Sequence, residues 1–289
     1  MITKAKKKFN PSTFHAKFVD DMTIAESFNI KDSVIPDPSR AQPDTFHARL
    51  GLKLDPTKSK VYKKIKEIKD YSDENEMKLN LGKTKFMLFN PTLKYDFVPN
   101  LEVNGTKLET MEEMKLLGLR IRNDLSWKSN TESMVHRAYQ KLWMLKRLKR
   151  QGANLDDLTD IYVKQVRSIL EFGVPVWNSG LTQEEVSDIE RVQKSFLYIA
   201  LGEDYSDYGN ALSESNLEML SRRRTKLCKS FALKTSKHPK HHHWFAKTEP
   251  GPFTRSEKPA FKPPLCRLTR LKKSPIPYLT SLLNTFKKK

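Results

Sequence analysis

The sequence predicts an α+β fold, in which a partial antiparallel sheet is followed by an all-α helical bundle and a basic, Pro-rich tail. Three observations support this prediction. β-rich runs and turn signals dominate up to Trp127, and apolar residues at helical spacing dominate residues 128–220. Residues 221–289 hold 19 Lys and Arg against two acids. We therefore expect domains at 1–127, 128–220 and 221–289, the last largely irregular.

The first predicted domain begins with a hairpin at Phe18-Val19-Asp20-Asp21, where an aromatic and a spacer precede two adjacent carboxylates. Residues 34–59 carry four prolines with little periodicity, which indicates an insertion loop. A helix is then predicted from about Lys58, with Val61, Ile65 and Ile68 on one face.

Three β-rich segments complete this domain. A polar turn at Lys83-Thr84 leads into the first, which extends to Phe89. Asn104-Gly105 favours a type I′ turn and so predicts a second hairpin. The third runs from Leu116 to Ile121. Together these segments predict the partial antiparallel sheet.

Helical periodicity begins again at residue 130. The first bundle helix, 130–150, places one apolar stripe at Met134, Ala138, Leu142, Leu145 and Leu148. Asn154 is the predicted N-cap of the second helix, and Thr182 with Glu185 forms a capping box for the third. The expected buried face of the second helix is Leu158, Ile161, Tyr162, Gln165, Ile169 and Phe172.

The C-terminal region is predicted to contribute one further element to the bundle. Residues 213–236 predict a fourth, basic helix. Little folded structure is expected from Pro239 onward, because prolines and lysines are frequent there.

The charge of the chain predicts a polyanionic partner. Its formal net charge is +19, and residues 221–289 account for +17 of it. The candidate nucleic-acid-binding cations lie on the first bundle helix and in the following basic region; they are Arg137, Lys141, Lys146, Arg147, Lys149, Arg150, Arg222, Arg223 and Arg224.

Other composition features bear on location. The two cysteines are far apart in sequence, which favours a reducing compartment over a disulfide framework. No apolar run approaches the roughly 20 residues that span a bilayer, so we expect no membrane partner. The chain is expected to be intracellular, and its runs of Arg and Lys are compatible with a nuclear location.

Several motifs occur in an order that resembles a known family. These motifs are Phe18-Val19-Asp20-Asp21, Asn80 to Phe89, Leu116-Leu117-Gly118-Leu119, Leu125-Ser126-Trp127, Val174-Pro175-Val176-Trp177, Ile189 to Lys194 and Ser274 to Asn284. The series resembles the C-terminal half of a reverse transcriptase from a non-LTR (LINE-type) retrotransposon, from the catalytic hairpin of the palm through the thumb and tail.

The resemblance implies roles for five residues. Asp20 would be a ligand of a two-metal Mg²⁺ site, with Asp21 as its neighbour and second ligand. Phe18 would pack under the primer terminus. Lys83 would neutralise or protonate the leaving pyrophosphate, although the residue pattern itself favours a solvated turn lysine. Gly118 would lie in a hairpin that grips the primer, where a glycine lets the backbone approach closely.

The chain also departs from the family. Only 17 residues precede Phe18, which is too few for the strand bearing the earlier aspartate, the fingers and the endonuclease. Two carboxylates on one turn cannot alone hold two cations about 3.5–4 Å apart. Polymerase activity is therefore not expected from this chain alone. RNA and DNA, as template and primer, are the implied partners, together with a second polymerase chain that supplies the missing palm and fingers.

Three interpretations of function stay open from the sequence. The chain is a truncated, catalytically incomplete RNA-directed DNA polymerase that still binds nucleic acid, a non-enzymatic RNA- or DNA-binding protein, or a fragment of a longer active polymerase. Helical or strand spacing predicts that Trp127, Trp143 and Trp177 belong to the core rather than to base-stacking platforms. The histidines at 238 and 241–243 are expected to form a basic surface cluster rather than a metal site with Cys228.

Overall fold

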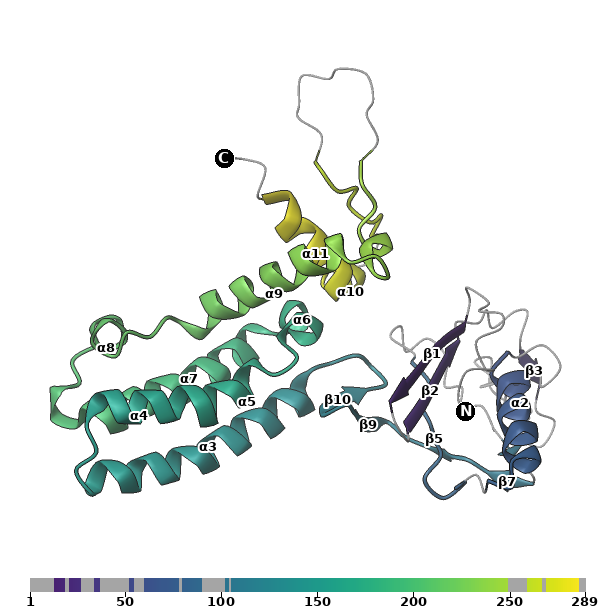
Figure 1. The fold of residues 1–289 in the computed structure, drawn as a ribbon, viewed down its shortest axis with the longest axis horizontal. Coiled ribbons are helices and arrows are strands. Elements are labelled where there is room, and N and C mark those ends of the chain that lie inside the picture. The colour runs from purple at the N-terminus through teal and green to yellow at the C-terminus, as the bar shows by residue number, and fades with distance from the viewer. Residues whose placement is uncertain are drawn as a thin grey trace, which may run out of the picture. The chain divides into compact units, whose positions relative to one another are not determined.

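The computed structural model describes residues 13–18, 21–26, 34–36, 52–54, 60–77, 80–89, 102–103, 105–248, 259–266 and 269–285. For the strands before residue 60 and for residues 102–103, only the backbone is described. The chain divides into two compact units (Figure 1), Met1–Met114 with Arg122–Leu125 and Lys115–Ile121 with Ser126–Lys289. It mixes short strands with helices, and its larger unit contains a helical bundle.

The strands of the described residues form separate two-stranded pairs. β1 (Thr13–Phe18) is antiparallel to β2 (Asp21–Glu26), with Phe18 opposite Asp21, so the predicted hairpin is present. The other pairs are β3 (Val34–Pro36) with β4 (Leu52–Leu54), β5 (Lys85–Phe86) with β8 (Glu109–Thr110), β6 (Glu102–Val103) with β7 (Thr106–Lys107), and β9 (Glu113–Leu116) with β10 (Leu119–Arg122).

These pairs correct two predictions. They do not merge into one antiparallel sheet, and the β5–β8 pair is parallel. Their strands are only two to six residues long, which limits how far each ladder extends. The β3–β4 pair lies inside the predicted insertion loop, so residues 34–59 are not wholly irregular. The predicted hairpin at Asn104-Gly105 is confirmed by the antiparallel pairing of β6 with β7.

The smaller unit has one described helix, α2 (Lys60–Glu74), which confirms the predicted helical spacing. Tyr62 and Ile65 on this helix pack with Leu81 and Phe86 around Leu108. Leu108 is the single buried apolar side chain among the described residues of this unit. Its hydrophobic cluster is therefore small.

The larger unit is built on three long helical segments that confirm the predicted bundle. They are α3 (Lys128–Arg150), the continuous run of α4 (Leu155–Ile161), η3 (Tyr162–Arg167) and α5 (Ser168–Glu171), and α7 (Gln183–Leu201). In Figure 1 the α4–α5 run returns alongside α3, as expected for helices joined by a short connection. Shorter elements are α6 (Val174–Trp177), η4 (Asn178–Gly180), η5 (Gly202–Asp204), α8 (Tyr208–Glu214) and η6 (His242–Trp244).

Both predicted helix caps are present. The Asn154 side chain accepts a hydrogen bond from the backbone N–H of Asp157 at 2.8 Å. Thr182 and Glu185 exchange hydrogen bonds as a complete capping box at the start of α7. These bonds satisfy N–H groups that the first helical turn leaves without partners.

The buried face of the second helical segment differs from the prediction. Gln165 and Phe172 are exposed, whereas Val166 and Leu170 are buried. The buried residues follow a strict four-residue repeat from Leu158 through Tyr162. In a regular α-helix this repeat would drift around the axis, but η3 is a π-helix. Its i→i+5 hydrogen bonds put more residues in each turn and keep these side chains on one face.

The core of the bundle is formed by apolar side chains from α3, the α4–α5 run, α6 and α7. Trp177 is completely buried, which confirms its predicted core position. Tyr162 stacks on Phe196 with ring centroids 4.1 Å apart, and its hydroxyl donates to Gln193 at 3.0 Å. The buried amide of Gln193 is thus hydrogen-bonded.

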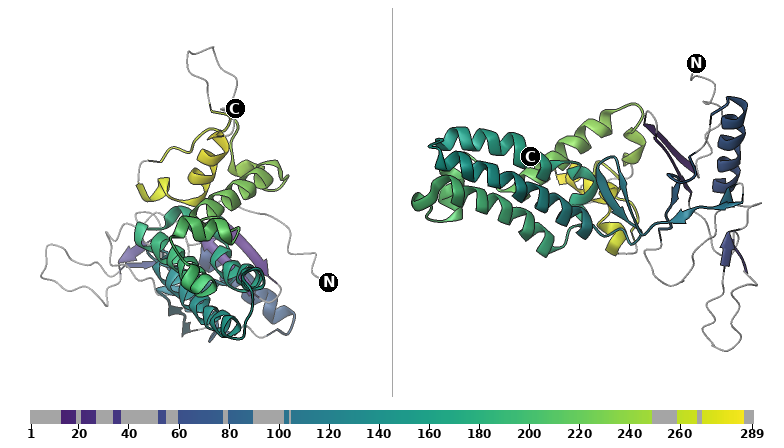
Figure 2. Two further views of the ribbon diagram at one scale, coloured as in Figure 1. Left: turned by 90° about the vertical axis from the view of Figure 1, so that its left-hand side faces the viewer. Right: turned by 90° about the horizontal axis from the view of Figure 1, so that it is seen from below.

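The C-terminal region is more ordered than predicted. α9 (Leu220–Lys237) confirms the predicted fourth, basic helix, whereas the helices α10 (Thr269–Lys272) and α11 (Pro275–Asn284) were not expected. α11 lies beside α9 in Figures 1 and 2. Cys228 on α9 and Leu279 and Leu283 on α11 belong to the bundle core. The described part of 221–289 is therefore an extension of the bundle and not a largely irregular tail.

Candidate nucleic-acid interface

The exposed face of α3 carries six of the nine cations predicted to bind nucleic acid. Met134, Ala138, Leu142 and Leu145 are buried and pack toward α7. Because this stripe is buried, the opposite side of α3 faces solvent. From Ser133 to Arg150 the helix contains no acid, and its cations are Arg137, Lys141, Lys146, Arg147, Lys149 and Arg150.

These six cations keep their charges available. None of them forms an ion pair with a carboxylate of the residues that the structure describes. Arg137 donates from Nε to the backbone oxygen of Ser133 at 3.3 Å, which leaves its charge unneutralised. Five of the six are exposed and Lys149 is half-buried. Arg147, Lys149 and Arg150 lie in the last turn, where they also interact favourably with the helix dipole.

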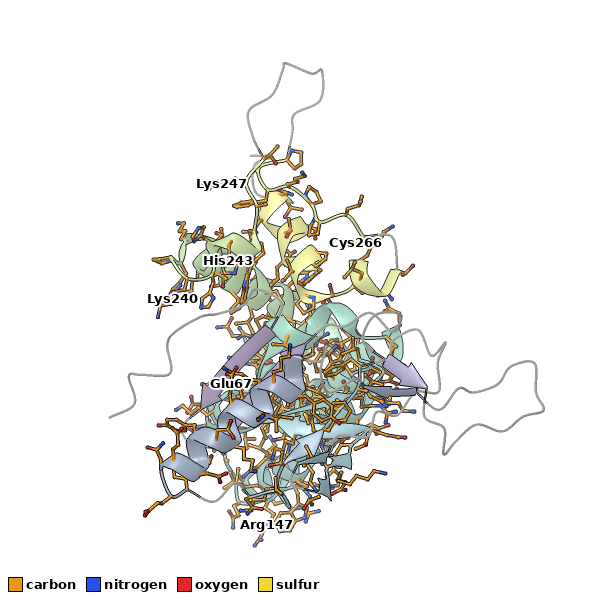
Figure 3. All side chains as sticks on the ribbon, turned by 90° about the vertical axis from the view of Figure 1, so that its right-hand side faces the viewer. Glu67, Arg147, Lys240, His243, Lys247 and Cys266 are labelled. Carbon is orange, nitrogen blue, oxygen red and sulfur yellow. The ribbon has the colours of Figure 1, made fainter. Side chains whose placement is uncertain are left out.

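An aromatic stripe runs through the middle of these cations. Tyr139, Trp143 and Arg147 follow one another at four-residue intervals and therefore share one face of α3. Trp143 is 63% exposed and Tyr139 is 41% exposed. The Arg147 guanidinium carbon lies 4.9 Å from the centre of the Trp143 ring, a cation–π contact. Figure 3 shows the labelled Arg147 side chain pointing outward.

The prediction that Trp143 belongs to the core is therefore wrong. Trp143 follows Leu142 by one residue and so lies off the buried stripe, which is the signal that identifies it as exposed. Helical spacing, on which the core prediction was based, therefore places Trp143 beside the buried stripe and not in it. Trp127, also predicted to be in the core, is partly buried and packs against it.

The three consecutive arginines of α9 have different environments. Arg222 is exposed and lines a shallow surface depression with Glu218, Thr225 and Lys226. Arg223 instead binds Glu171 on α5. Of the three arginines predicted to form one interface, only Arg222 is free to face a ligand.

Arg224 is buried and serves the core. It is 1% exposed, and its Nε donates to Oδ1 of Asn178 at 3.0 Å. Burial lowers the pKa of its guanidinium from the usual value. A buried guanidinium cannot reach a phosphate on the surface, so this part of the prediction is wrong.

Gly118 occupies the turn between β9 and β10. Leu117 and Gly118 both have positive φ, 49° and 87°, as a type I′ turn requires. A Cβ atom at Gly118 would lie 3.0 Å from the Phe172 ring. The close approach that this glycine permits is thus to a side chain of the same chain.

The predicted catalytic residues are described in part. Lys83 is exposed in the turn Leu81–Lys83, which Asn80 stabilises by accepting a hydrogen bond from the Lys83 backbone N–H at 3.1 Å. Asp20 lies outside the described residues, as do the side chains of Phe18 and Asp21. The backbones of Phe18 and Asp21 form the last pair of the β1–β2 ladder, and Val19 and Asp20 lie between them in sequence.

A metal site needs several ligand side chains close together. The structure brings together no group of three His, Cys, Asp or Glu side chains within its described part. Cys228 is buried and its thiol donates to the Val174 oxygen at 3.9 Å, whereas the histidines at 238 and 241–243 are exposed. The described residues thus offer no ligand set for Mg²⁺ and no Cys–His site, and the two aspartates stay a prediction.

No helix in the described ranges is both long enough and apolar enough to cross a membrane. Comparisons with models of protein families, with curated proteins and with solved structures found no match to this chain.

Proposed function

We propose that this chain is a reverse-transcriptase fragment that binds nucleic acid through the exposed face of α3. The observation that carries the binding proposal is the run of six cations without an acid between Ser133 and Arg150. A rigid helix presents them on a surface where no described carboxylate neutralises them. Such a surface binds phosphate backbones with little dependence on base sequence.

The polymerase origin rests on the resemblance and on one structural feature that is compatible with it. The β1–β2 hairpin has an antiparallel register that ends on Phe18 and Asp21. Val19 and Asp20 are the two residues between these paired positions, so the acidic doublet lies at the end of the ladder, as a palm hairpin requires. A complete two-metal site needs a further carboxylate from another strand, so we assign no catalytic step to this chain alone.

Mg²⁺ would be held by Asp20 and Asp21 if a second source of carboxylates completed the site. It would then supply the charge stabilisation on which phosphoryl transfer depends. A second polymerase chain is the proposed source. Within this chain, Asp20 and Asp21 would contribute negative charge at the hairpin turn.

A binding experiment on the full-length chain tests the proposal. Fluorescence anisotropy with a 20-nucleotide DNA strand and a 20-base-pair duplex would be recorded over a range of salt concentrations. We expect binding to both, with an affinity that falls steeply as salt rises. The variant Lys146→Gln/Arg150→Gln should weaken both complexes. For the single strand it should reduce the salt slope by about 1.4, at about 0.7 for each lost phosphate contact.

A matched control removes the same charge elsewhere. Lys63 and Lys66 are exposed on α2, among Glu67, Asp70 and Asp73. Lys63→Gln/Lys66→Gln should leave the affinity and the salt slope near those of the unmodified chain. Equal effects of the two double variants would overturn the assignment of the interface to α3. Point variants are used because deletion of 221–289 would remove core residues such as Cys228.

Asp20→Ala separates the polymerase proposal from a purely nucleic-acid-binding role. In a primer-extension assay with the complementary palm and fingers supplied as a second chain, the unmodified chain should restore synthesis and Asp20→Ala should abolish it. Both should bind nucleic acid equally well. Binding without any restored synthesis would favour a non-enzymatic RNA- or DNA-binding protein.

A further inference from the structure

We propose that Trp143 and Tyr139 on α3 form a stacking platform for the unpaired bases of single-stranded nucleic acid. This inference rests on the proposed function, because the same helix face supplies the phosphate contacts. It adds a preference for single strands that charge alone does not give. The aromatic rings would contact base faces while the neighbouring cations contact the backbone.

The exposure of Trp143 is the first observation behind this proposal. Tryptophan is usually highly buried, yet here 63% of the residue is accessible. Trp177 shows that the same bundle can bury an indole completely. Exposed Trp143 therefore contributes little to the core, and its apolar surface is available for a ligand.

The cations beside Trp143 indicate which kind of ligand this surface would bind. Arg147 stacks on the indole at 4.9 Å, and Lys146 and Arg150 lie close to it in the helical repeat. An aromatic ring among cations that pair with no carboxylate of the described residues matches a ligand that joins flat bases to a charged backbone. The stripe is too narrow and too highly charged for a mainly apolar protein partner or the acyl region of a membrane.

The spacing of the two rings agrees with a strand of successive bases. Tyr139 and Trp143 are four residues apart on α3, which corresponds to about 6 Å along the helix axis. Two neighbouring bases of an extended strand can therefore each meet one ring. In a duplex the base faces are covered by the stack, so the rings cannot reach them, and only the phosphate contacts remain.

Substitution of Trp143 in the full-length chain tests the platform. Trp143→Ala should weaken binding to oligo(dT) of 20 nucleotides by about 5- to 150-fold, the loss expected for one stacked base. Its affinity for the 20-base-pair duplex should change less than twofold. Trp143→Phe should retain most of the single-strand affinity, because a smaller ring still stacks. Oligo(U) of the same length distinguishes RNA from DNA as the preferred strand.

The control variant is Tyr71→Ala. Tyr71 is 50% exposed on α2 but lies beside Asp70 and Asp73, where carboxylates offset the neighbouring lysines, unlike the acid-free part of α3. Its substitution should leave single-strand binding unchanged. Thermal unfolding should be the same for Trp143→Ala and the unmodified chain, because an exposed ring adds little to the core.

The possible results separate this inference from the proposed function. Salt-dependent binding to both ligands with no selective loss in Trp143→Ala would overturn the stacking platform alone. Absence of binding to either ligand would overturn both proposals. Binding of the unmodified chain to anionic phosphatidylserine vesicles, lost in Trp143→Ala while oligo(dT) binding persists, would also overturn the platform.

Discussion

Arg223 binds Glu171 through two hydrogen bonds, from Nε to Oε1 at 2.5 Å and from Nη2 to Oε2 at 3.0 Å. This pair joins α9 to α5, two helices that are about fifty residues apart in the chain. Arg167 lies 3.8 Å from the same carboxylate. The hydrogen bonds that Arg223 donates to the Glu171 carboxylate raise the pKa of its guanidinium. Arg223 is therefore a structural residue of the bundle.

We predict that Arg223→Ala lowers the free energy of unfolding by about 1–3 kcal/mol, the range for hydrogen bonds to charged groups. Arg167 should limit the loss because it still faces Glu171. Arg222→Ala, at the exposed neighbouring position, should change the stability by less than about 0.5 kcal/mol. Urea unfolding followed by circular dichroism measures both values. Equal destabilisation by the two variants would contradict the structural role of the pair.

Glu190 anchors the beginning of α9. Its carboxylate accepts hydrogen bonds from the backbone N–H groups of Leu220 at 3.0 Å and Ser221 at 3.3 Å, and from the Tyr208 hydroxyl. The first N–H groups of a helix have no partner within the helix, and a negative charge there is favoured by the helix dipole. Burial and the hydrogen bond to Glu190 raise the pKa of Tyr208.

We predict that Glu190→Ala costs about 2–4 kcal/mol of stability, because it leaves one buried donor, the Leu220 N–H, and two partly buried donors without this acceptor. Glu190→Gln should cost about 1 kcal/mol, since its amide oxygen still accepts one hydrogen bond. The local readout is amide hydrogen exchange at Leu220 and Ser221, which should become faster in both variants. Ser187→Ala, on the exposed side of the same helix, is the control and should leave this exchange unchanged.

Cys228 and two tyrosines, one buried and one partly buried, predict a loss of stability at alkaline pH. Burial raises the pKa of the Cys228 thiol to about 11, from an ordinary value of 9.0. The unfolded thiol thus loses its proton at a lower pH than the folded one. Stability from this group is complete below about pH 9 and declines until about pH 11. Burial likewise raises the pKa of Tyr162 and Tyr278, which adds to the decline.

The measurement is the free energy of unfolding between pH 8 and pH 11, for the unmodified chain and for Cys228→Ser. The hydroxyl of serine can still donate to Val174 but does not titrate in this range. The unmodified chain should lose about 2–3 kcal/mol more than the variant, which corresponds to a shift of about two pKa units. A parallel decline of both chains would show that the tyrosines alone cause the alkaline effect.

How far the sequence predicts this fold depends on the range of the interactions involved. Asn154 and Thr182 were identified correctly because a helix cap bonds to residues only three positions away. α11 was missed because Pro275 and Pro277 suggested irregular structure. Both prolines instead lie in the first turn of that helix, where no intrahelical N–H bond is required of them.

The candidate site, too, is predictable from the sequence only where its interactions are short-range. The cations of α3 were predicted from helical spacing, which is local. The roles of Arg223 and Arg224 depend on Glu171 and Asn178, which are distant in sequence and become neighbours only after folding. No local pattern around the three arginines distinguishes the one that stays exposed.

The docking of α11 gives the last prediction. Leu283 is buried in the bundle core, and the neighbouring Asn284 side chain exchanges two hydrogen bonds of 2.9 Å with the backbone of Phe261. Leu283→Ala should lower the free energy of unfolding by about 2–4 kcal/mol, through lost burial and the cavity left behind. Ile276→Ala removes a partly exposed side chain of the same helix and should cost less than about 1 kcal/mol. If Leu283→Ala unfolded at the same urea concentration as Ile276→Ala, α11 would not be part of the cooperative bundle. A single transition at a lower urea concentration would show instead that the C-terminal helix and the bundle unfold together.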